Sequence, residues 1–238
     1  MTEISLDDLQ NGYFIYQQKK GFRFGMDAVL LASFANIKPT ERVVDFGTGN
    51  GIIPILLAAR DKGKHITGLE IQENSANLAQ KSVEYNKLEE RISIVRGDIK
   101  EASKILEIEK FDAIVSNPPY MISDHGLKNA ASEKYIARHE ALCSFDDIAR
   151  EASRLLVSKG RFFMVHRPFR LAELICTLKK YHLEPKRMRL VYPFIDKEPN
   201  MVLVEAMKGA NSEIKIEKPL IVYKEVGVYT EELLELYK

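Results

Sequence analysis

The sequence has no tryptophan and only two cysteines in 238 residues. Two cysteines are too few for a disulfide framework, and Cys143 and Cys176 lack the spacing of metal ligands. Both are therefore expected to be reduced, buried and inert thiols of a cytosolic protein. No metal site is expected.

Long hydrophobic runs are also missing. The longest, residues 28–35 and 52–59, fall far short of the about 18 apolar residues that span a membrane. Residues 1–10 have neither a basic start nor an apolar core, so no secretory signal is expected there. These absences favour a cytoplasmic protein without a membrane segment.

Charge of one sign does not dominate, because the net charge is only +1. A balanced total can still hide a basic face, so it excludes no partner. Charged residues at 29% and hydrophobic residues at 45% are ordinary values for a globular protein. The length suits one main domain, and no stretch is rich enough in Gly, Pro or Ser to divide it.

Short apolar segments alternate with helical patterns from residue 42 onward. Strands are expected at residues 43–46, 66–69, 92–95, 113–116, 161–166, near 190 and at 201–207, and helices at 27–34, 52–60, 75–86, 145–156 and 171–181. The strands lack the alternation of a half-exposed sheet, so both sheet faces should be covered by helices. The pattern predicts an α/β fold with a mostly parallel sheet.

A glycine-rich segment, Asp45-Phe46-Gly47-Thr48-Gly49-Asn50-Gly51, lies between the first of these strands and a helix. Closely spaced glycines let a backbone pass close to a ligand at a helix N-terminus. A dinucleotide site would favour a third glycine at position 52, where Ile52 stands. The segment therefore predicts a ligand loop and argues against NAD.

Acidic residues follow the next two strands. Glu70 is placed where such folds bind ribose hydroxyls, and Asp98 could accept from the exocyclic amine of adenine. Either residue alone could equally cap a helix or end a solvated loop. Their order on consecutive strand ends favours ligand binding over these alternatives.

The fourth strand is followed by Asn117-Pro118-Pro119-Tyr120. The Asn117 side-chain oxygen and the Pro118 carbonyl could each accept one N–H of a planar amino group, and Tyr120 could stack on its ring. These three are the candidate catalytic residues. The alternative is that the prolines close a turn and Tyr120 packs in the core.

Together these features resemble the S-adenosylmethionine site of class I methyltransferases, in which Asn-Pro-Pro-Tyr is the fourth motif. The resemblance implies a Rossmann-like fold with a seven-stranded, mostly parallel sheet, helices on both faces, and S-adenosyl-L-methionine as cofactor. It assigns cofactor contacts to Phe24, Gly25, Asp27, Asp45, Gly47, Thr48, Gly49, Glu70, Asp98 and Asn117.

The motif order is shared by N6-adenine methyltransferases of RNA or DNA and by protein glutamine N5-methyltransferases. The glutamine enzymes that modify release factors carry a helical domain before the fold, and only about 40 residues precede Val43 here. Residues 23–32 and 137–140, together with the compact length, resemble the bacterial tRNA1(Val) adenine-37 N6-methyltransferases. That resemblance assigns Arg138 and His139 to a substrate loop, although a salt-bridged loop anchor explains them equally well.

A basic segment supports an RNA partner. Residues 159–189 contain nine Lys or Arg against two Glu. Such a surface suits phosphate contacts, although a charge-rich stretch can also be only a solvated face. Arg167 and Arg170, just after a strand end, are the favoured substrate contacts.

The expectation is thus a monomeric tRNA methyltransferase. Residues 1–40 should form an extension packed on the cofactor site, residues 41–208 the methyltransferase domain, and residues 209–238 a tail of one strand and one helix. A non-catalytic RNA-binding relative is the remaining alternative, and the intact motifs argue against it.

Overall fold

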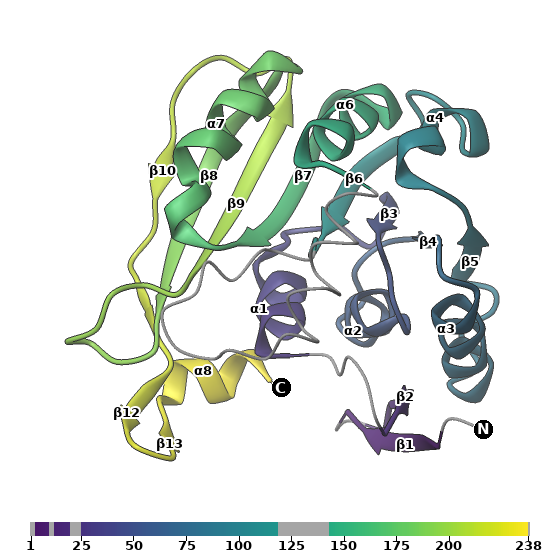
Figure 1. Cartoon of the computed structure of the whole chain (residues 1–238), viewed down its shortest axis with the longest axis horizontal. Coiled ribbons are helices and arrows are strands. Elements are labelled where there is room, and N and C mark those ends of the chain that lie inside the picture. The colour runs from purple at the N-terminus through teal and green to yellow at the C-terminus, as the bar shows by residue number, and fades with distance from the viewer. Residues whose placement is uncertain (1–2, 10–11, 20–24, 119–142, 238) are drawn as a thin grey trace.

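A nine-stranded sheet forms the centre of the protein, as seen in the computed structural model (Figure 1). The structure describes residues 3–9, 12–19, 25–118 and 143–237. The seven long strands of the sheet are β3 (Arg42–Phe46), β4 (His65–Glu70), β5 (Ile92–Arg96), β6 (Phe111–Ser116), β7 (Leu156–His166), β8 (Leu183–Tyr192) and β9 (Met201–Lys208). Their order is β5-β4-β3-β6-β7-β9-β8, and only β9 runs antiparallel to its neighbours. The expected α/β fold with a mostly parallel sheet is confirmed.

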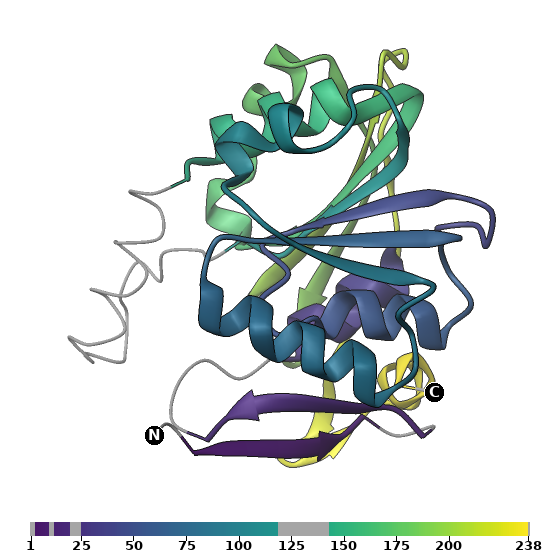
Figure 2. The ribbon, with the colours of Figure 1, turned by 90° about the vertical axis from the view of Figure 1, so that its right-hand side faces the viewer.

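Helices cover both faces of this sheet (Figure 2). One face carries α1 (Met26–Phe34), α2 (Ile52–Ala59) and α3 (Glu73–Tyr85), and the other carries α4 (Ala102–Ile105), α6 (Phe145–Leu155) and α7 (Leu171–Lys180). Successive strand residues face opposite sides, so Val43 joins one hydrophobic cluster and Val44 the other. This double burial explains why the strands read as continuous apolar runs.

The expected helices and strands are present, with ends shifted by a few residues. Two short strands of the tail, β10 (Lys215–Ile216) and β11 (Leu220–Ile221), pair with β8 and extend the seven expected strands to nine. The hairpin β12 (Tyr223–Glu225) and β13 (Val228–Tyr229) and the helix α8 (Glu231–Leu236) follow. The tail is thus joined to the sheet by backbone pairing.

An N-terminal hairpin, β1 (Ile4–Asp8) and β2 (Phe14–Gln18), was not expected from the sequence. The backbone N–H groups of Phe14 and Tyr16 donate to the side chains of Asn86 and Ser82, at or near the end of α3. These side chains satisfy the outer edge of β2, which would otherwise be an unpaired strand edge.

The expected burial of both cysteines is wrong, since Cys143 is half-buried and Cys176 is exposed. Cys176 lies on α7 midway between the buried Leu174 and Leu178, so the helical period turns its side chain outward. Burial raises the pKa of the Cys143 thiol to about 12. Cys143 is therefore protonated at neutral pH and a poor nucleophile.

No helix in the described part of the chain is long and apolar enough to cross a membrane.

Candidate active site

The carboxyl ends of β3, β4 and β6 meet at one edge of the sheet. In the parallel register Phe46 lies opposite both Leu69 and Ser116. The Ser116 hydroxyl donates to the Phe46 carbonyl over 3.2 Å, which ties the two strand ends together. The glycine loop after β3 and Asn117 after β6 therefore begin side by side.

The glycine loop crosses from β3 over the end of β4. The backbone N–H groups of Gly47 and Thr48 both donate to the Leu69 carbonyl, at 2.9 and 3.1 Å. Gly49 has a φ of 59°, in the left-handed region that glycine adopts without strain. A Cβ at Gly49 would meet no atom of the described residues within 4 Å, so the backbone is open on this side with respect to them. That arrangement suits close approach of a ligand to the loop.

Glu70 fixes the conformation of this loop from the end of β4. Its carboxylate accepts the Gly49 N–H over 2.9 Å through Oε2 and the Gln72 N–H over 2.8 Å through Oε1. A carboxylate has about four acceptor positions, so each oxygen retains a lone pair for a ribose hydroxyl. Glu70 thus braces the loop, and its predicted ribose contact stays a prediction.

Asp45 is fully buried at the end of β3, and neither carboxylate oxygen has a hydrogen-bond partner among the described residues. The hydroxyl of Thr48, also buried, is likewise without a partner there. Burial raises the pKa of the Asp45 carboxyl to about 7; the nearby Thr48 hydroxyl opposes this shift, and the charge of Glu70 adds to it. A positively charged ligand would stabilise the ionised carboxylate. These orphaned groups fit S-adenosylmethionine, which carries a sulfonium and an ammonium group.

Asn117 directly follows β6, and its predicted role as an acceptor of an amino group stays a prediction. Its side-chain oxygen is buried and has no hydrogen-bond partner within the described residues. Pro118, the next residue, is also buried. A buried carbonyl oxygen without a donor is costly, which is typical of a site completed by a ligand.

Other predicted cofactor residues have structural roles. Asp98 accepts the Lys100 N–H and caps the 3-10 helix η1 (Ile99–Glu101). Gly25 is the N-cap of α1, and a Cβ there would lie 2.8 Å from the Asp27 carboxylate. Capping explains Asp98 without a ligand, so its contact with adenine stays a prediction.

Several predicted residues fall outside the part of the chain that the structure describes. They are Phe24 for the cofactor, Tyr120 for catalysis, and Arg138 and His139 for the substrate loop.

A pocket of about 170 Å³ adjoins the candidate acceptor site. Its lining includes Pro118, His166 at the end of β7, and Arg170. Burial and the charge of Arg170 lower the pKa of His166 to about 4, so this imidazole is neutral at pH 7. The sequence reasoning missed His166, although a titratable residue that ends an apolar strand beside Arg167 was a usable signal.

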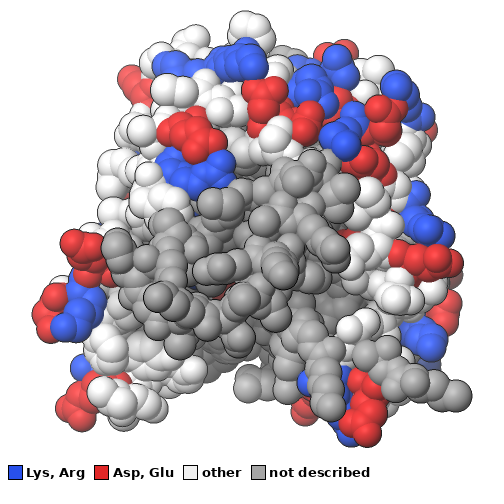
Figure 3. Space-filling view, viewed as in Figure 1, with Lys and Arg blue, Asp and Glu red and all other residues white. Residues whose placement is uncertain are grey.

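The basic segment 159–189 does not form one free cationic surface. Every one of its nine cations donates to a protein group: Lys159 to the Gly209 carbonyl, Arg161 to Glu41, Arg167 to the Asn200 carbonyl, Arg170 to Glu173, Lys179 to Glu184, Lys180 to Asp146, Lys186 to the Asn211 carbonyl, Arg187 to Glu205 and Glu217, and Arg189 to Glu232. On the face drawn in Figure 3, acidic and basic side chains of the described residues are intermixed. Each cation of the segment therefore has a partner within the protein, and the predicted phosphate contacts of Arg167 and Arg170 stay a prediction.

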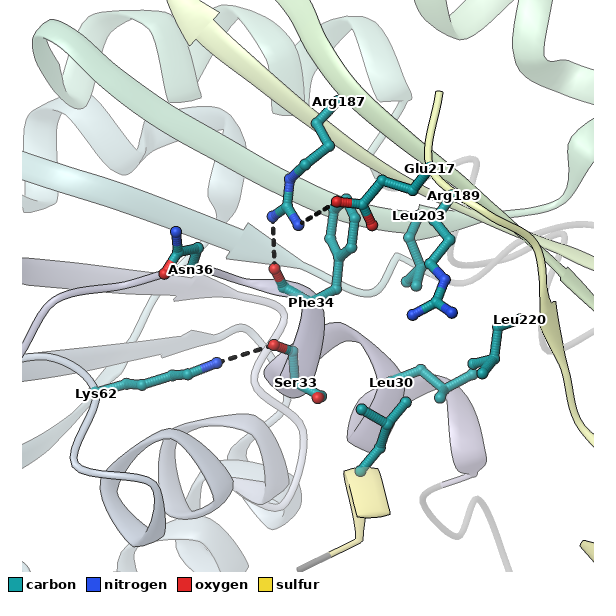
Figure 4. A pocket seen from close by; sticks show the side chains of 11 residues that line it. Leu30, Ser33, Phe34, Asn36, Lys62, Arg187, Arg189, Leu203, Glu217 and Leu220 are labelled. Carbon is teal, nitrogen blue, oxygen red and sulfur yellow. Dashed lines mark hydrogen bonds and ion pairs between the residues drawn. The ribbon is translucent and has the colours of Figure 1, made fainter. Parts of the chain in front are cut away.

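A larger cavity of about 260 Å³ lies at the other end of α1 (Figure 4). The Lys62 ammonium donates to the carbonyls of Ala32, Ser33 and Ala35, and Arg187 donates to that of Phe34. These cations satisfy the unpaired carbonyls at the C-terminus of the helix. The cavity is lined by structural contacts and is remote from the strand ends that carry the candidate site.

Within the described residues, no group of three or more His, Cys, Asp or Glu is arranged to hold a metal ion.

Asp45 should make cofactor affinity depend on pH. Below about pH 7 the carboxyl of the free protein is protonated, so a cationic ligand must displace a proton. We expect the affinity for S-adenosylmethionine, measured by calorimetry, to rise between about pH 6 and about pH 8. Asp45→Asn should bind more weakly and flatten the profile, whereas the exposed Asp61→Asn should keep it. A wild-type profile unchanged by Asp45→Asn would contradict this role.

The same carboxyl should affect stability. In the unfolded chain it ionises near the ordinary pKa of 3.8, and in the folded protein only near 7. The folded state therefore holds the extra proton between these values. The free energy of unfolding of the wild-type protein should therefore fall, relative to that of the Asp45→Asn variant, as the pH rises from about 4 to about 7.

Glu70→Gln should weaken S-adenosylmethionine binding at least about tenfold, because the new amide NH₂ group would face one of two backbone N–H donors. The matched control is Glu73→Gln, whose exposed carboxylate pairs with Arg96. Calorimetric affinity equal to that of the wild type would show that Glu70 is dispensable.

Comparison with known proteins shows which protein family this chain is similar to. The profile of the methyltransferase small domain matches residues 24–182. A tRNA1(Val) (adenine(37)-N6)-methyltransferase from Porphyromonas gingivalis is 31% identical over 223 residues, which cover 90% of this chain and 86% of that protein. A protein of the same name from Aeromonas salmonicida is 28% identical over 225 residues, which cover 94% of this chain and 92% of that protein.

Solved structures share the fold. A predicted O-methyltransferase from Agrobacterium tumefaciens superposes with a TM-score of 0.71 at 26% identity, covering 89% of this chain and 95% of that one. The 16S rRNA N2 G1207 methyltransferase of T. Thermophilus, solved with AdoMet and guanosine, superposes with a TM-score of 0.60 at 21% identity. The match covers 87% of this chain and 50% of that one. The second likeness shows the fold alone. With the family profile spanning most of the sequence, the chain belongs to the methyltransferase small domain family and is a class I methyltransferase that uses S-adenosyl-L-methionine.

Proposed function

We propose that this protein methylates N6 of adenine 37 in tRNA1(Val). The observation that carries the proposal is the buried, unpartnered carbonyl oxygen of Asn117, placed beside the glycine loop at the shared strand edge. Such an acceptor suits an amino group. The substrate follows from relatives of that name, which match nearly the whole chain at about 30% identity.

The adenine amino group is a weak nucleophile, because its lone pair is delocalised into the ring. Asn117 Oδ1 accepts one of its N–H groups and the Pro118 carbonyl accepts the other. Both oxygens then stabilise the positive charge that develops on N6 and aim its lone pair. When bound, S-adenosylmethionine would supply the methyl group: its sulfur–methyl bond would break as the bond to N6 forms, S-adenosylhomocysteine would leave, and a proton would pass from N6 to solvent. No strong base is required, because that proton becomes acidic only as the new bond forms.

The cofactor is held between the glycine loop, Glu70 and Asp45. Phe24, Gly25 and Asp27 extend this site, and the N-terminal hairpin of β1 and β2 packs beside it. The hydrogen bond from Asn50 Nδ2 of the glycine loop to the Tyr16 carbonyl, 3.3 Å long, supports that arrangement.

On the substrate side, Tyr120 stacks on the adenine, and Arg138, His139, Arg167 and Arg170 contact the RNA. The protein acts as a monomer in the cytoplasm, where its tRNA substrate is found. Residues 209–238 stabilise β8, the last long strand on one side of the sheet, by pairing with it.

The substrate assignment can be tested with labelled S-adenosylmethionine and a transcript of tRNA1(Val). Label should enter the transcript and should be lost when adenine 37 is replaced by guanine. Label in a release-factor protein would favour glutamine methylation instead. Cofactor and RNA binding without transfer would favour a non-catalytic relative.

Asn117→Ala should lower kcat by about 100-fold to 1,000-fold, the usual effect of removing one preorganised polar group. Affinity for S-adenosylmethionine should stay within a few fold, measured by calorimetry. The free protein should unfold at an equal or higher temperature, because the substitution removes a buried acceptor that has no donor. Asn211→Ala, at an exposed position, is the control. A collapse of cofactor binding would contradict the proposed role.

A further inference from the structure

An exposed aromatic ring follows β7 on the 3-10 helix η2 (Pro168–Arg170). The side chain of Phe169 is 59% exposed. It makes no ring contact within the described part of the chain. Single exposed apolar residues are common, so exposure alone decides nothing. The position of this ring is more informative.

Phe169 lies next to the candidate methyl-acceptor residues. Ser116 of β6 pairs with Met164 of β7, so Asn117 and Pro118 leave the sheet beside the last residues of β7. Neighbouring strands are about 4.8 Å apart. The pocket of about 170 Å³ spans this junction, since both Pro118 and Arg170 line it. Arg170, the residue after Phe169, therefore places η2 at the edge of the sheet that carries the candidate acceptor site.

The turn presents this ring on a fixed support. Pro168 fixes its own φ, and the Arg170 N–H donates to the Arg167 carbonyl over 3.3 Å. The Arg167 side chain donates to the Asn200 carbonyl at 2.8 Å, and that of Arg170 forms a two-point ion pair with Glu173. Both flanking side chains are thus anchored, whereas the ring between them faces solvent.

An aromatic side chain between two cations has the composition of a single-stranded nucleic-acid site. A flat ring stacks on a base of any sequence, and guanidinium groups attract the phosphates on either side. A protein partner would be expected to bury more apolar surface than one phenyl ring. The continuity with the acceptor site therefore favours RNA as the occupant.

We propose that Phe169 stacks on a nucleobase adjacent to the target adenine and so holds the RNA loop against the sheet edge. The proposal rests on the proposed function, because it requires an RNA substrate. It assigns Phe169 a binding contact and no part in the chemistry of transfer.

Phe169→Ala should raise the Kd and KM for the tRNA1(Val) transcript about tenfold, within the usual range of a lost base-stacking contact. Affinity for S-adenosylmethionine should not change. Phe169→Trp should retain binding, whereas Phe169→Leu, apolar but not flat, should behave like the Ala variant. The dependence of RNA affinity on salt should keep its slope, because a phenyl ring neutralises no phosphate.

Ile108→Ala is the matched control. Ile108 is 56% exposed and precedes β6, at the opposite edge of the sheet. Its substitution should leave RNA affinity unchanged. An equal loss in both variants would mean a general effect on stability and would overturn the proposal.

Transcripts that lack one base test the contact itself. Removing the base on the 5′ or the 3′ side of adenine 37 should weaken wild-type binding at one of these positions. At that position Phe169→Ala should cause no further loss, because the stacking partner is already absent. Additive losses at both positions would overturn the proposal. If the wild-type protein methylates the transcript while the Ala variant binds it normally, the stacking inference fails and the proposed function stands.

Discussion

The hydrogen bond from the Gly49 N–H to the Glu70 carboxylate connects the two strand ends on which the candidate site is built. A hydrogen bond to an ionised acceptor is stronger than a neutral one and has a defined direction. Because the other oxygen of Glu70 accepts the Gln72 N–H, the carboxylate is held in one orientation. An acid at this position therefore shapes the loop before any ligand binds. The start of α2 and the space beside Gly49 depend on that shape.

Within the described residues, most buried polar groups that lack a partner gather at the candidate site. Four of the five such atoms found among the described residues belong to Asp45, Thr48 and Asn117. Elsewhere the buried carboxylate of Glu151 accepts from the Ser103 N–H and from Arg154. Leaving polar groups buried and unpaired costs free energy, which a complementary ligand recovers on binding. The concentration of these groups at one edge separates a binding site from ordinary packing.

The central sheet could be predicted from the sequence because each buried strand leaves its pattern within a few consecutive residues. Apolar runs broken by helical patterns directly report strands that are buried on both faces. The β1–β2 hairpin escaped the same reasoning, since its edge is satisfied by Ser82 and Asn86, which are distant in sequence. The positions of the glycine loop and Asn117 at one edge could be predicted because each follows a parallel strand. Asp98 shows the limit of that rule, because capping η1 requires the same residue at the same place.

Counting charges along the sequence could not identify the partners of these cations, for a related reason. The segment 159–189 is basic because its partners lie elsewhere in the chain: Arg187 pairs with Glu205 and Glu217, and Arg189 with Glu232. The arginines of this segment have different roles that depend on where they lie in the sheet. Those within β8 bind the C-terminus of α1 and the tail, whereas Arg167 and Arg170 lie beyond the end of β7, at the edge shared with Asn117. The side chains of both Arg167 and Arg170 are already hydrogen-bonded within the protein, to the Asn200 carbonyl and to Glu173. In the proposed complex, a flat ring that stacks on a base adds affinity that depends neither on the phosphates nor on the base sequence.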